Sequence, residues 1–95
     1  MVSGALGSQV IGSTIRPASY CGIYGYKPSA GGINRGGSFD GFSQSSTGML
    51  AATLAEIWSL TREITSRAGG DAGHPGVMGP MDLPAARKPS KVALL

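Results

Sequence analysis

The pattern of apolar positions along the chain predicts one long helix. Between Met49 and Arg67, apolar side chains recur at offsets of three and four, which gathers them on one helical face. Polar and charged residues take the other face, where Glu63 and Arg67 stand four residues apart and can pair. The apolar stripe comprises Leu50, Leu54, Ile57, Trp58, Thr61 and Ile64.

Shorter elements are expected before this helix. Pro17 suits the first turn of a helix and Gly22 suits a helix end, so residues 17–21 are expected to form one helical turn. The run 23–27 reads as a short strand. Residues 29–48 are rich in glycine and are expected to form a loop.

The limits of the long helix and the segment after it follow from turn-forming residues. Ser46 or Thr47 is expected to cap the helix start, and the pair Gly69-Gly70 is expected to end it. Four prolines predict an extended connection over 71–90. The apolar run 91–95 resembles a strand that has been cut, so we expect the chain to be an internal piece of a longer protein.

Composition narrows the class of protein. A chain of 95 residues is at most one small domain, and 16 glycines with 6 prolines indicate a loop-rich fold with a thin core. The net charge of +3 is spread along the chain, which argues against a nucleic-acid partner. No apolar run approaches the roughly 20 residues that span a bilayer, so no membrane partner is expected. The single cysteine, Cys21, excludes an internal disulfide and favours a reducing, cytoplasmic location.

Candidate chemistry lies in the glycine- and serine-rich stretch 7–18. A serine that follows glycine in a tight loop can present its hydroxyl to a substrate while nearby N–H groups stabilise an oxyanion. The same stretch approaches a phosphate-binding loop, but Ser13 stands where that loop requires lysine. Without further information, a Gly-Ser pair is more typical of a turn than of a catalytic site.

The chain has few residues that could form other kinds of catalytic site. A Ser–His–Asp site would need His74, the single histidine, together with Asp40, Asp71 or Asp82. His74 stands between glycine and proline, which favours an exposed position in a loop. The chain has too few potential ligands for a metal site, and no cofactor is expected.

The longest specific motif covers residues 5–29. It begins Ala-Leu-Gly-Ser-Gln and continues from residue 12 as Gly-Ser-Thr-Ile-Arg-Pro-Ala-Ser-Tyr-Cys-Gly-Ile-Tyr-Gly-Tyr-Lys-Pro-Ser. This order of a serine-rich loop, Arg, Pro-Ala, Cys-Gly and a Gly-x-Lys-Pro strand end resembles the amidase signature family. Looser similarity extends over 48–56, 69–76 and 83–87, so residues 1–95 are expected to form a partial amidase domain. The resemblance implies an α/β fold with a mixed sheet covered by helices, of which this chain would supply one or two strands and one long helix.

Carried over position by position, the resemblance gives Ser13 the role of nucleophile. It gives Val10, Ile11 and Gly12 the backbone N–H groups that line the oxyanion hole. Family members cleave carboxylic amide bonds with a Ser–cis-Ser–Lys triad, in which the lysine acts as general base through the bridging serine. The implied substrate is a small-molecule amide and no cofactor is implied, whereas the oligomeric state is left open.

Several residues carry individual expectations. Ile11 replaces a glycine common in the family, so a left-handed backbone there would be strained. Arg16 is expected to position the loop by hydrogen bonds. Cys21 and Trp58 are expected to be buried in apolar packing.

The family's bridging serine and lysine lie farther upstream of the nucleophile than the twelve residues that precede Ser13 here. Ser3 and Ser8 are too near to be the bridging serine, and Lys27 lies on the wrong side and matches a strand-end position instead. We therefore expect the isolated chain to hydrolyse nothing. We also expect it to fold poorly, because its helical stripe would have no covering sheet.

Two other functions stay open. The first is the amidotransferase subunit that frees ammonia from glutamine for misacylated tRNA. The second is a non-catalytic, truncated relative that serves as a binding or structural piece.

Overall fold

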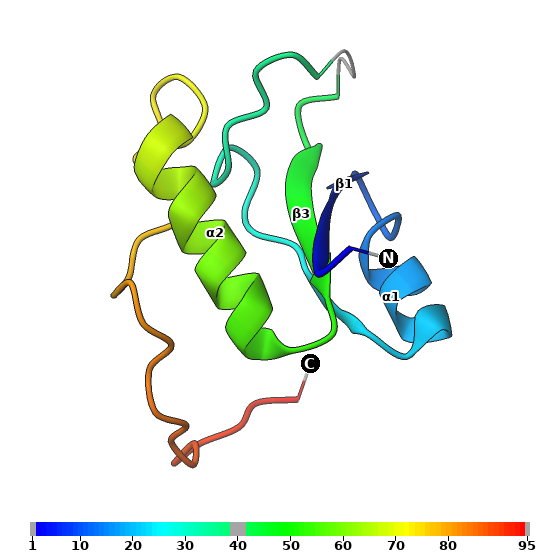
Figure 1. Ribbon diagram of the computed structural model, residues 1–95, viewed down its shortest axis with the longest axis vertical. Coiled ribbons are helices and arrows are strands. Elements are labelled where there is room, and N and C mark those ends of the chain that lie inside the picture. Colours follow the sequence, from blue (N-terminus) through cyan, green and yellow to red (C-terminus); the bar gives the residue numbers. More distant parts are fainter. Residues whose placement is uncertain (1, 39–41, 95) are drawn as a thin grey trace.

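A computed structural model of the chain describes residues 2–38 and 42–94, so Asp40 and Leu95 lie outside the described residues. Three strands and two helices form in the described part (Figure 1). They are β1 (Gly4–Gln9), α1 (Ile15–Cys21), β2 (Tyr24–Tyr26), β3 (Ser46–Ala51) and α2 (Leu54–Ala68). The expected α/β class is confirmed, with at least one more strand than the expectation allowed.

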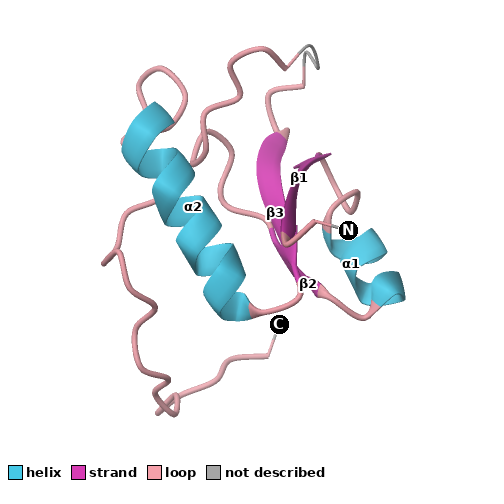
Figure 2. Cartoon of the chain, viewed as in Figure 1, coloured by secondary structure: helices cyan, strands magenta, loops and turns pink. Residues whose placement is uncertain are grey.

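The three strands form one sheet in the order β1-β3-β2, and both outer strands run antiparallel to β3. The two helices lie on opposite sides of this sheet, α2 on one side and α1 on the other (Figure 2). Successive side chains of a strand point to opposite faces of the sheet, so each side chain of β3 faces either α1 or α2. Met49 and Ala51 face α2, whereas Gly48 and Leu50 face α1.

Three glycines, one from each strand, make the sheet face under α1 flat. Gly7 pairs with Gly48, Gly25 pairs with Leu50 two residues further along β3, and a Cβ added to Gly25 would lie 2.8 Å from the Cβ of Ala18. A Cβ on Gly48 would lie 2.6 Å from the main-chain oxygen of Tyr26. Side chains at these positions would push α1 away, so the glycines set its close approach to the sheet.

The opposite face holds the small apolar core. Met49, Ala51, Ile33 and Ile57 are buried together, and α2 supplies Ile57 to this cluster. The sheet therefore covers the apolar side of α2, and the expectation that the helical stripe would lack a covering sheet is wrong.

The start of the long helix differs from the expectation. Residues 46–51 form β3, so Ser46 and Thr47 are strand residues and cannot cap the helix. Thr53 caps it instead, because its hydroxyl accepts a hydrogen bond from the Glu56 N–H at 3.2 Å while the Glu56 carboxylate accepts from the Thr53 N–H at 3.0 Å. This reciprocal capping box fixes the first turn at Leu54. Leu50 matched the helical spacing by coincidence, since it belongs to the sheet face under α1.

Other element predictions are confirmed with changed limits. The predicted turn at 17–21 lies within α1, which Gly22 ends with a left-handed φ of 63°. The predicted strand at 23–27 contains β2, and Gly69 ends α2. Cys21 is exposed, so its predicted burial is wrong: it lies in the last turn of a helix whose buried contact is Ala18.

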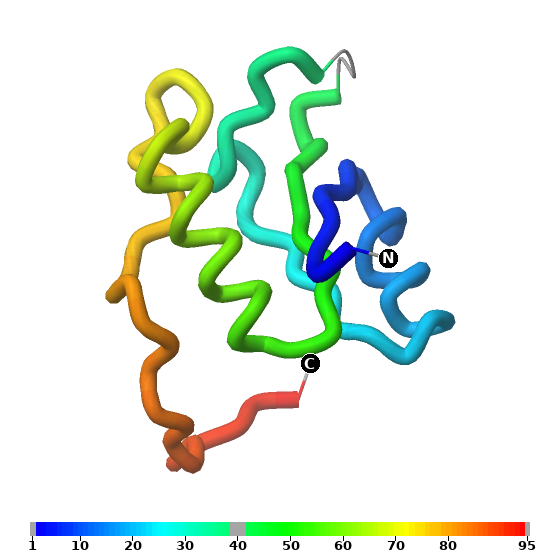
Figure 3. The backbone as a smooth tube through the Cα atoms, viewed as in Figure 1, coloured from blue at the N-terminus to red at the C-terminus, as the bar shows by residue number. Residues whose placement is uncertain are grey.

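The segment after α2 has no regular structure over its described residues 69–94, as predicted for 71–90 (Figure 2). Residues 91–94, predicted as a strand, do not form one. The segment passes beside α2 (Figure 3), where Trp58 contacts it: Nε1 donates to the Pro80 carbonyl at 3.1 Å and the ring lies against Gly79. Trp58 is thus half-buried under this segment, which is less burial than predicted. Among the described helices, none is long and apolar enough to cross a membrane.

Candidate active site

Ser13 lies in the short connection between β1 and α1, two residues before the helix begins. Its side chain is exposed, and no hydrogen bond within the described residues engages its hydroxyl. The loop turns tightly there, since the Arg16 N–H donates to the Gly12 carbonyl at 2.9 Å. The Ser13 hydroxyl is therefore accessible to a substrate.

Gln9, the last residue of β1, fixes this loop from beneath. Only 3% of its surface is exposed. Its Oε1 accepts hydrogen bonds from the N–H groups of Thr14 at 2.6 Å and Ile15 at 2.9 Å, and its Nε2 donates to the Ile11 carbonyl at 3.1 Å. Thr14 occupies the N-cap position of α1 without a capping bond from its own side chain, so Gln9 takes over the capping of the helix.

The N–H groups at the top of the loop have no such partner. Outside strand pairing, none of the hydrogen bonds of the described residues uses the N–H of Ile11, Gly12 or Ser13. Ile11 is 85% exposed, and no described residue other than glycine has a positive φ. The strain anticipated at Ile11 is therefore absent. Unpaired backbone N–H groups beside an exposed hydroxyl are the groups that a loop needs to stabilise an oxyanion.

Arg16 was expected to position the loop by hydrogen bonds from its side chain. Within the described residues its side chain forms none, so this expectation is wrong. Its guanidinium lies over Gly12 instead: a Cβ on Gly12 would lie 3.4 Å from both Nε and one terminal nitrogen. Its main-chain N–H, rather than its side chain, takes part in the turn.

Thr14 fills the space between the loop and the sheet. It is fully buried, and its side chain packs against Gly7 of β1 and Gly48 of β3. Within the part of the chain that the structure describes, its hydroxyl has no hydrogen-bond partner, and neither has that of Ser46, the strand partner of Gln9. The underside of the Ser13 loop is therefore a packed, buried region that contains polar groups.

No base is assembled next to Ser13 within the described residues. The Ser8 hydroxyl contacts that of Ser45 at 3.1 Å, and Ser3 is exposed. Lys27 follows β2 and forms no hydrogen bond with Ser13. The structure thus brings together the loop and its support, but not the general base.

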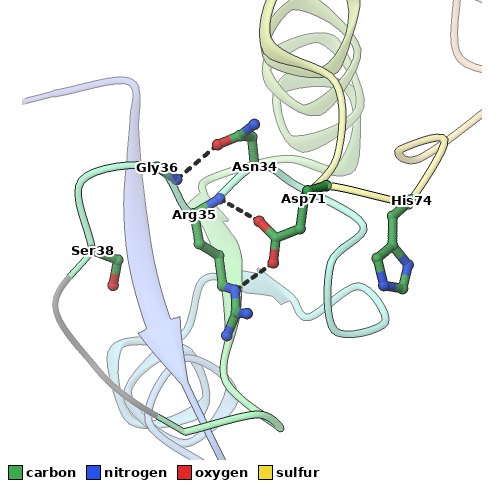
Figure 4. Close-up of a pocket in the computed structure, with 7 residues that line it drawn as sticks. Asn34, Arg35, Gly36, Ser38, Asp71 and His74 are labelled. Carbon is green, nitrogen blue, oxygen red and sulfur yellow. Dashed lines mark hydrogen bonds and ion pairs between the residues drawn. The ribbon is translucent and has the colours of Figure 1, made fainter.

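A second polar cluster joins two distant loops (Figure 4). The Asp71 carboxylate accepts from the Arg35 N–H at 2.8 Å and from Arg35 Nε at 2.7 Å. One terminal nitrogen of Arg35 donates to the carbonyls of Phe42 and Ser45, at 3.1 and 3.0 Å. Arg35 therefore ties the loop after α2 to the residues that enter β3.

This cluster does not form the alternative Ser–His–Asp site. Arg35 occupies the Asp71 carboxylate (Figure 4). The ring of His74 packs against Gly31 instead. His74 is exposed, as predicted, and reaches Asp71 only by donating its main-chain N–H to the Asp71 carbonyl at 2.8 Å. Ser13 does not line the pocket of about 510 Å³ beside these residues. Among the described residues, no group of three or more potential ligands could hold a metal ion.

Replacing Asp71 by alanine is expected to lower the free energy of unfolding by about 1–3 kcal/mol, because Arg35, only 26% exposed, would lose its carboxylate partner. Glu63→Ala is the matched control, since it removes an ion pair to Arg67 that is mostly exposed and should cost less than about 1 kcal/mol. Urea unfolding at pH 7 measures both variants. Equal losses would mean that the Arg35–Asp71 pair is no more than a surface contact.

The same pair predicts a pH dependence of stability. Hydrogen bonds from the main chain and then the side chain of Arg35 lower the pKa of Asp71 below its ordinary value of 3.8. A carboxyl whose pKa is lower in the folded state stabilises the fold above the unfolded pKa, and this contribution disappears as the pH falls through the folded pKa. The difference in stability between the wild type and Asp71→Ala should therefore shrink below about pH 4.

Comparison with known proteins places the chain in a family. The family model described as Amidase matches residues 1–94. The chain belongs to the amidase family. The amidase resemblance of the sequence motif is thereby confirmed.

Curated relatives of this chain include glutamyl-tRNA(Gln) amidotransferase A subunits. The subunit of Methanothermobacter thermautotrophicus is 43% identical over 63 residues, which cover 65% of this chain and 14% of the relative. That of Thermotoga maritima is 39% identical over 68 residues, or 72% and 12% of the two chains. That of Endomicrobium trichonymphae is 58% identical over 38 residues, which cover 40% of this chain and 8% of the relative. The matched part thus covers a small share of each of these relatives, and no solved structure gives a significant match.

Sequence reasoning did not anticipate the contacts of three residues, Gln9 under the loop and the pair Arg35–Asp71 between two other loops. Gln9 carries a usable signal, because it is a polar residue that ends a strand directly before the loop of Ser13. Arg35 and Asp71 carry none, since 36 residues separate them and only the fold brings them together.

Proposed function

We propose that this chain carries the nucleophile element of a serine amidase and that Ser13 is the nucleophile. Membership of the amidase family supports this role, as does the exposed position of the Ser13 hydroxyl at the start of α1. The observation that carries the proposal is the row of unpaired N–H groups beside it, at Ile11 and Gly12. A loop of this kind suits acyl transfer, in which negative charge develops on the substrate oxygen.

In the proposed reaction, Ser13 Oγ attacks the carbonyl carbon of a carboxylic amide while its proton passes to a base. The carbonyl oxygen becomes an oxyanion that accepts hydrogen bonds from the backbone N–H groups of Val10, Ile11 and Gly12. The C–N bond then breaks, and the base returns the proton to the departing amine or ammonia. Water attacks the resulting ester and releases the acid, which restores the Ser13 hydroxyl.

The base is proposed to be a lysine that acts through a bridging serine, as the family resemblance implies. Within the described residues, neither Ser3 nor Lys27 forms a hydrogen bond with Ser13, and we propose that the 95 residues alone are inactive unless a bridging serine and a lysine are supplied. A serine without a base is a weak nucleophile at neutral pH.

Covalent labelling tests the proposal directly. The complete product of the gene should react with a fluorophosphonate probe, and peptide mass spectrometry should find the adduct on Ser13. Labelling elsewhere, or none in a folded protein that also hydrolyses no amide, would favour the non-catalytic alternative.

A second candidate function is the release of ammonia from glutamine for transfer to a misacylated tRNA. The names of the relatives above support it, although they are matched over only a small part of their length. Ammonia released from glutamine, rising when partner subunits of the amidotransferase are added, would favour this function. Hydrolysis of simple carboxamides without any partner would favour the general amidase.

A further inference from the structure

We propose that Gln9 is a positioning residue for the reaction at Ser13, an assignment that rests on the function proposed above. Its side-chain amide divides the N–H groups of the nucleophile loop into two sets. Those of Thr14 and Ile15 are held by Gln9 Oε1, whereas those of Ile11 and Gly12 remain available to a substrate.

The contacts of Gln9 fix the loop at both ends. The two bonds to Oε1, at 2.6 and 2.9 Å, anchor the residues just after Ser13. The bond from Nε2 to the Ile11 carbonyl, at 3.1 Å, anchors a residue just before it. With its carbonyl held from below, the peptide that joins Ile11 to Gly12 directs its N–H away from Gln9, because the two groups of a trans peptide point in opposite directions.

Burial strengthens one of these bonds in particular. Gln9 is buried at the end of β1, opposite Ser46 in the strand register, and Thr14 is buried above the same face of the sheet. The bond between them is buried, whereas the bonds to Ile11 and Ile15 are partly buried. A buried hydrogen bond is stronger than one in water, and an unsatisfied polar group there is correspondingly costly.

The chemistry at this position requires a neutral amide of this length. Two N–H donors need an acceptor and one carbonyl needs a donor, and a side-chain amide supplies both. A glutamate keeps the acceptor but directs an oxygen at the Ile11 carbonyl, and it places negative charge beneath the site of the developing oxyanion. An asparagine is one methylene shorter and cannot span both contacts.

The experiment compares Gln9→Leu and Gln9→Glu in the complete gene product. Matched controls are Gln44→Leu and Gln44→Glu, which make the same changes at an exposed glutamine in another loop. One measurement is amide hydrogen exchange at Thr14 and Ile15, with Ala18 as internal reference because its N–H donates to the Thr14 carbonyl at 3.2 Å. The other is the rate of fluorophosphonate labelling of Ser13, with kcat and KM for an amide substrate.

In Gln9→Leu, exchange at Thr14 and Ile15 should rise at least about tenfold relative to Ala18. Labelling and kcat should fall about 100-fold while KM changes by less than about threefold, since misplaced groups act mainly in the transition state. Gln9→Glu should keep the protection of both amides and still react about tenfold more slowly. The Gln44 variants should match the wild type.

In Gln9→Leu, unchanged exchange at Thr14 and Ile15, or a kcat within about threefold of wild type per folded molecule, would overturn the assignment. If Gln9→Leu does not fold, Gln9→Glu decides by its rate of labelling. If the wild type is neither labelled at Ser13 nor active, the proposed function fails, and the exchange measurement alone then decides whether Gln9 holds the loop.

Discussion

Replacing Ser13 by alanine should reduce amide hydrolysis by the complete gene product about 10⁴-fold or more and abolish fluorophosphonate labelling. Removal of the nucleophile of a serine hydrolase leaves only the oxyanion hole and substrate binding to accelerate the reaction. Ser13 is exposed and forms no hydrogen bond within the described residues, so the fold should be unaffected. The free energy of unfolding is therefore expected to change by less than about 0.5 kcal/mol.

Ser19→Ala is the matched control for this variant. Ser19 is a second exposed serine that lies within α1, and its side chain forms no hydrogen bond within the described residues. Its replacement should leave both labelling and hydrolysis unchanged. An active Ser13→Ala variant would remove Ser13 from the mechanism and leave a binding or structural role for this loop.

Replacing Gly48 by alanine should destabilise the fold by about 3 kcal/mol, at the upper end of what overpacking of a core costs. The added Cβ would stand 2.6 Å from the main-chain oxygen of Tyr26, and it would also press on Thr14 at 3.1 Å. Backbone cannot yield as a flexible side chain does, so β2 or α1 must move. Because Thr14 adjoins Ser13, labelling of Ser13 should also slow in the fraction that remains folded.

Gly7→Ala provides a graded comparison, since Gly7 is the register partner of Gly48 on β1. Its added Cβ would meet only side-chain atoms, the nearest being the Thr14 hydroxyl at 3.0 Å. These atoms can shift, so the loss should be about 1 kcal/mol. Urea unfolding measures both variants. A smaller loss for Gly48→Ala than for Gly7→Ala would mean that the close approach of β2 to β3 does not limit stability.

The predictions for Gly48 and for Gln9 depend on the same layer of the fold. The glycine face of the sheet supports Thr14, Thr14 supports the loop, and Gln9 fixes the loop at the end of β1. A change at Gly48 and a change at Gln9 should therefore slow the same step, although only the first should strongly lower stability.

Local patterns in the sequence predicted the elements that short-range interactions specify. Gly22 and Gly69 end helices because they adopt a left-handed φ that other residues resist, and this can be read directly from the chain. The C-terminal part of α2 and the position of β2 follow from periodicity in the same way. The loop of Ser13 could be singled out because its motif is contiguous, and the family comparison confirmed the amidase resemblance.

Long-range pairing determined the remainder. Residues 46–48 were predicted as loop and 49–51 as helix, and only their pairing with β1 and β2 makes residues 46–51 the central strand. Gln9 looks like an ordinary polar residue until β1 brings it under the loop, and Arg35 finds Asp71 across 36 residues. The difference has a physical reason. Caps and turns are satisfied by neighbours in sequence, whereas strand pairing and buried polar contacts depend on which distant segments the fold brings together.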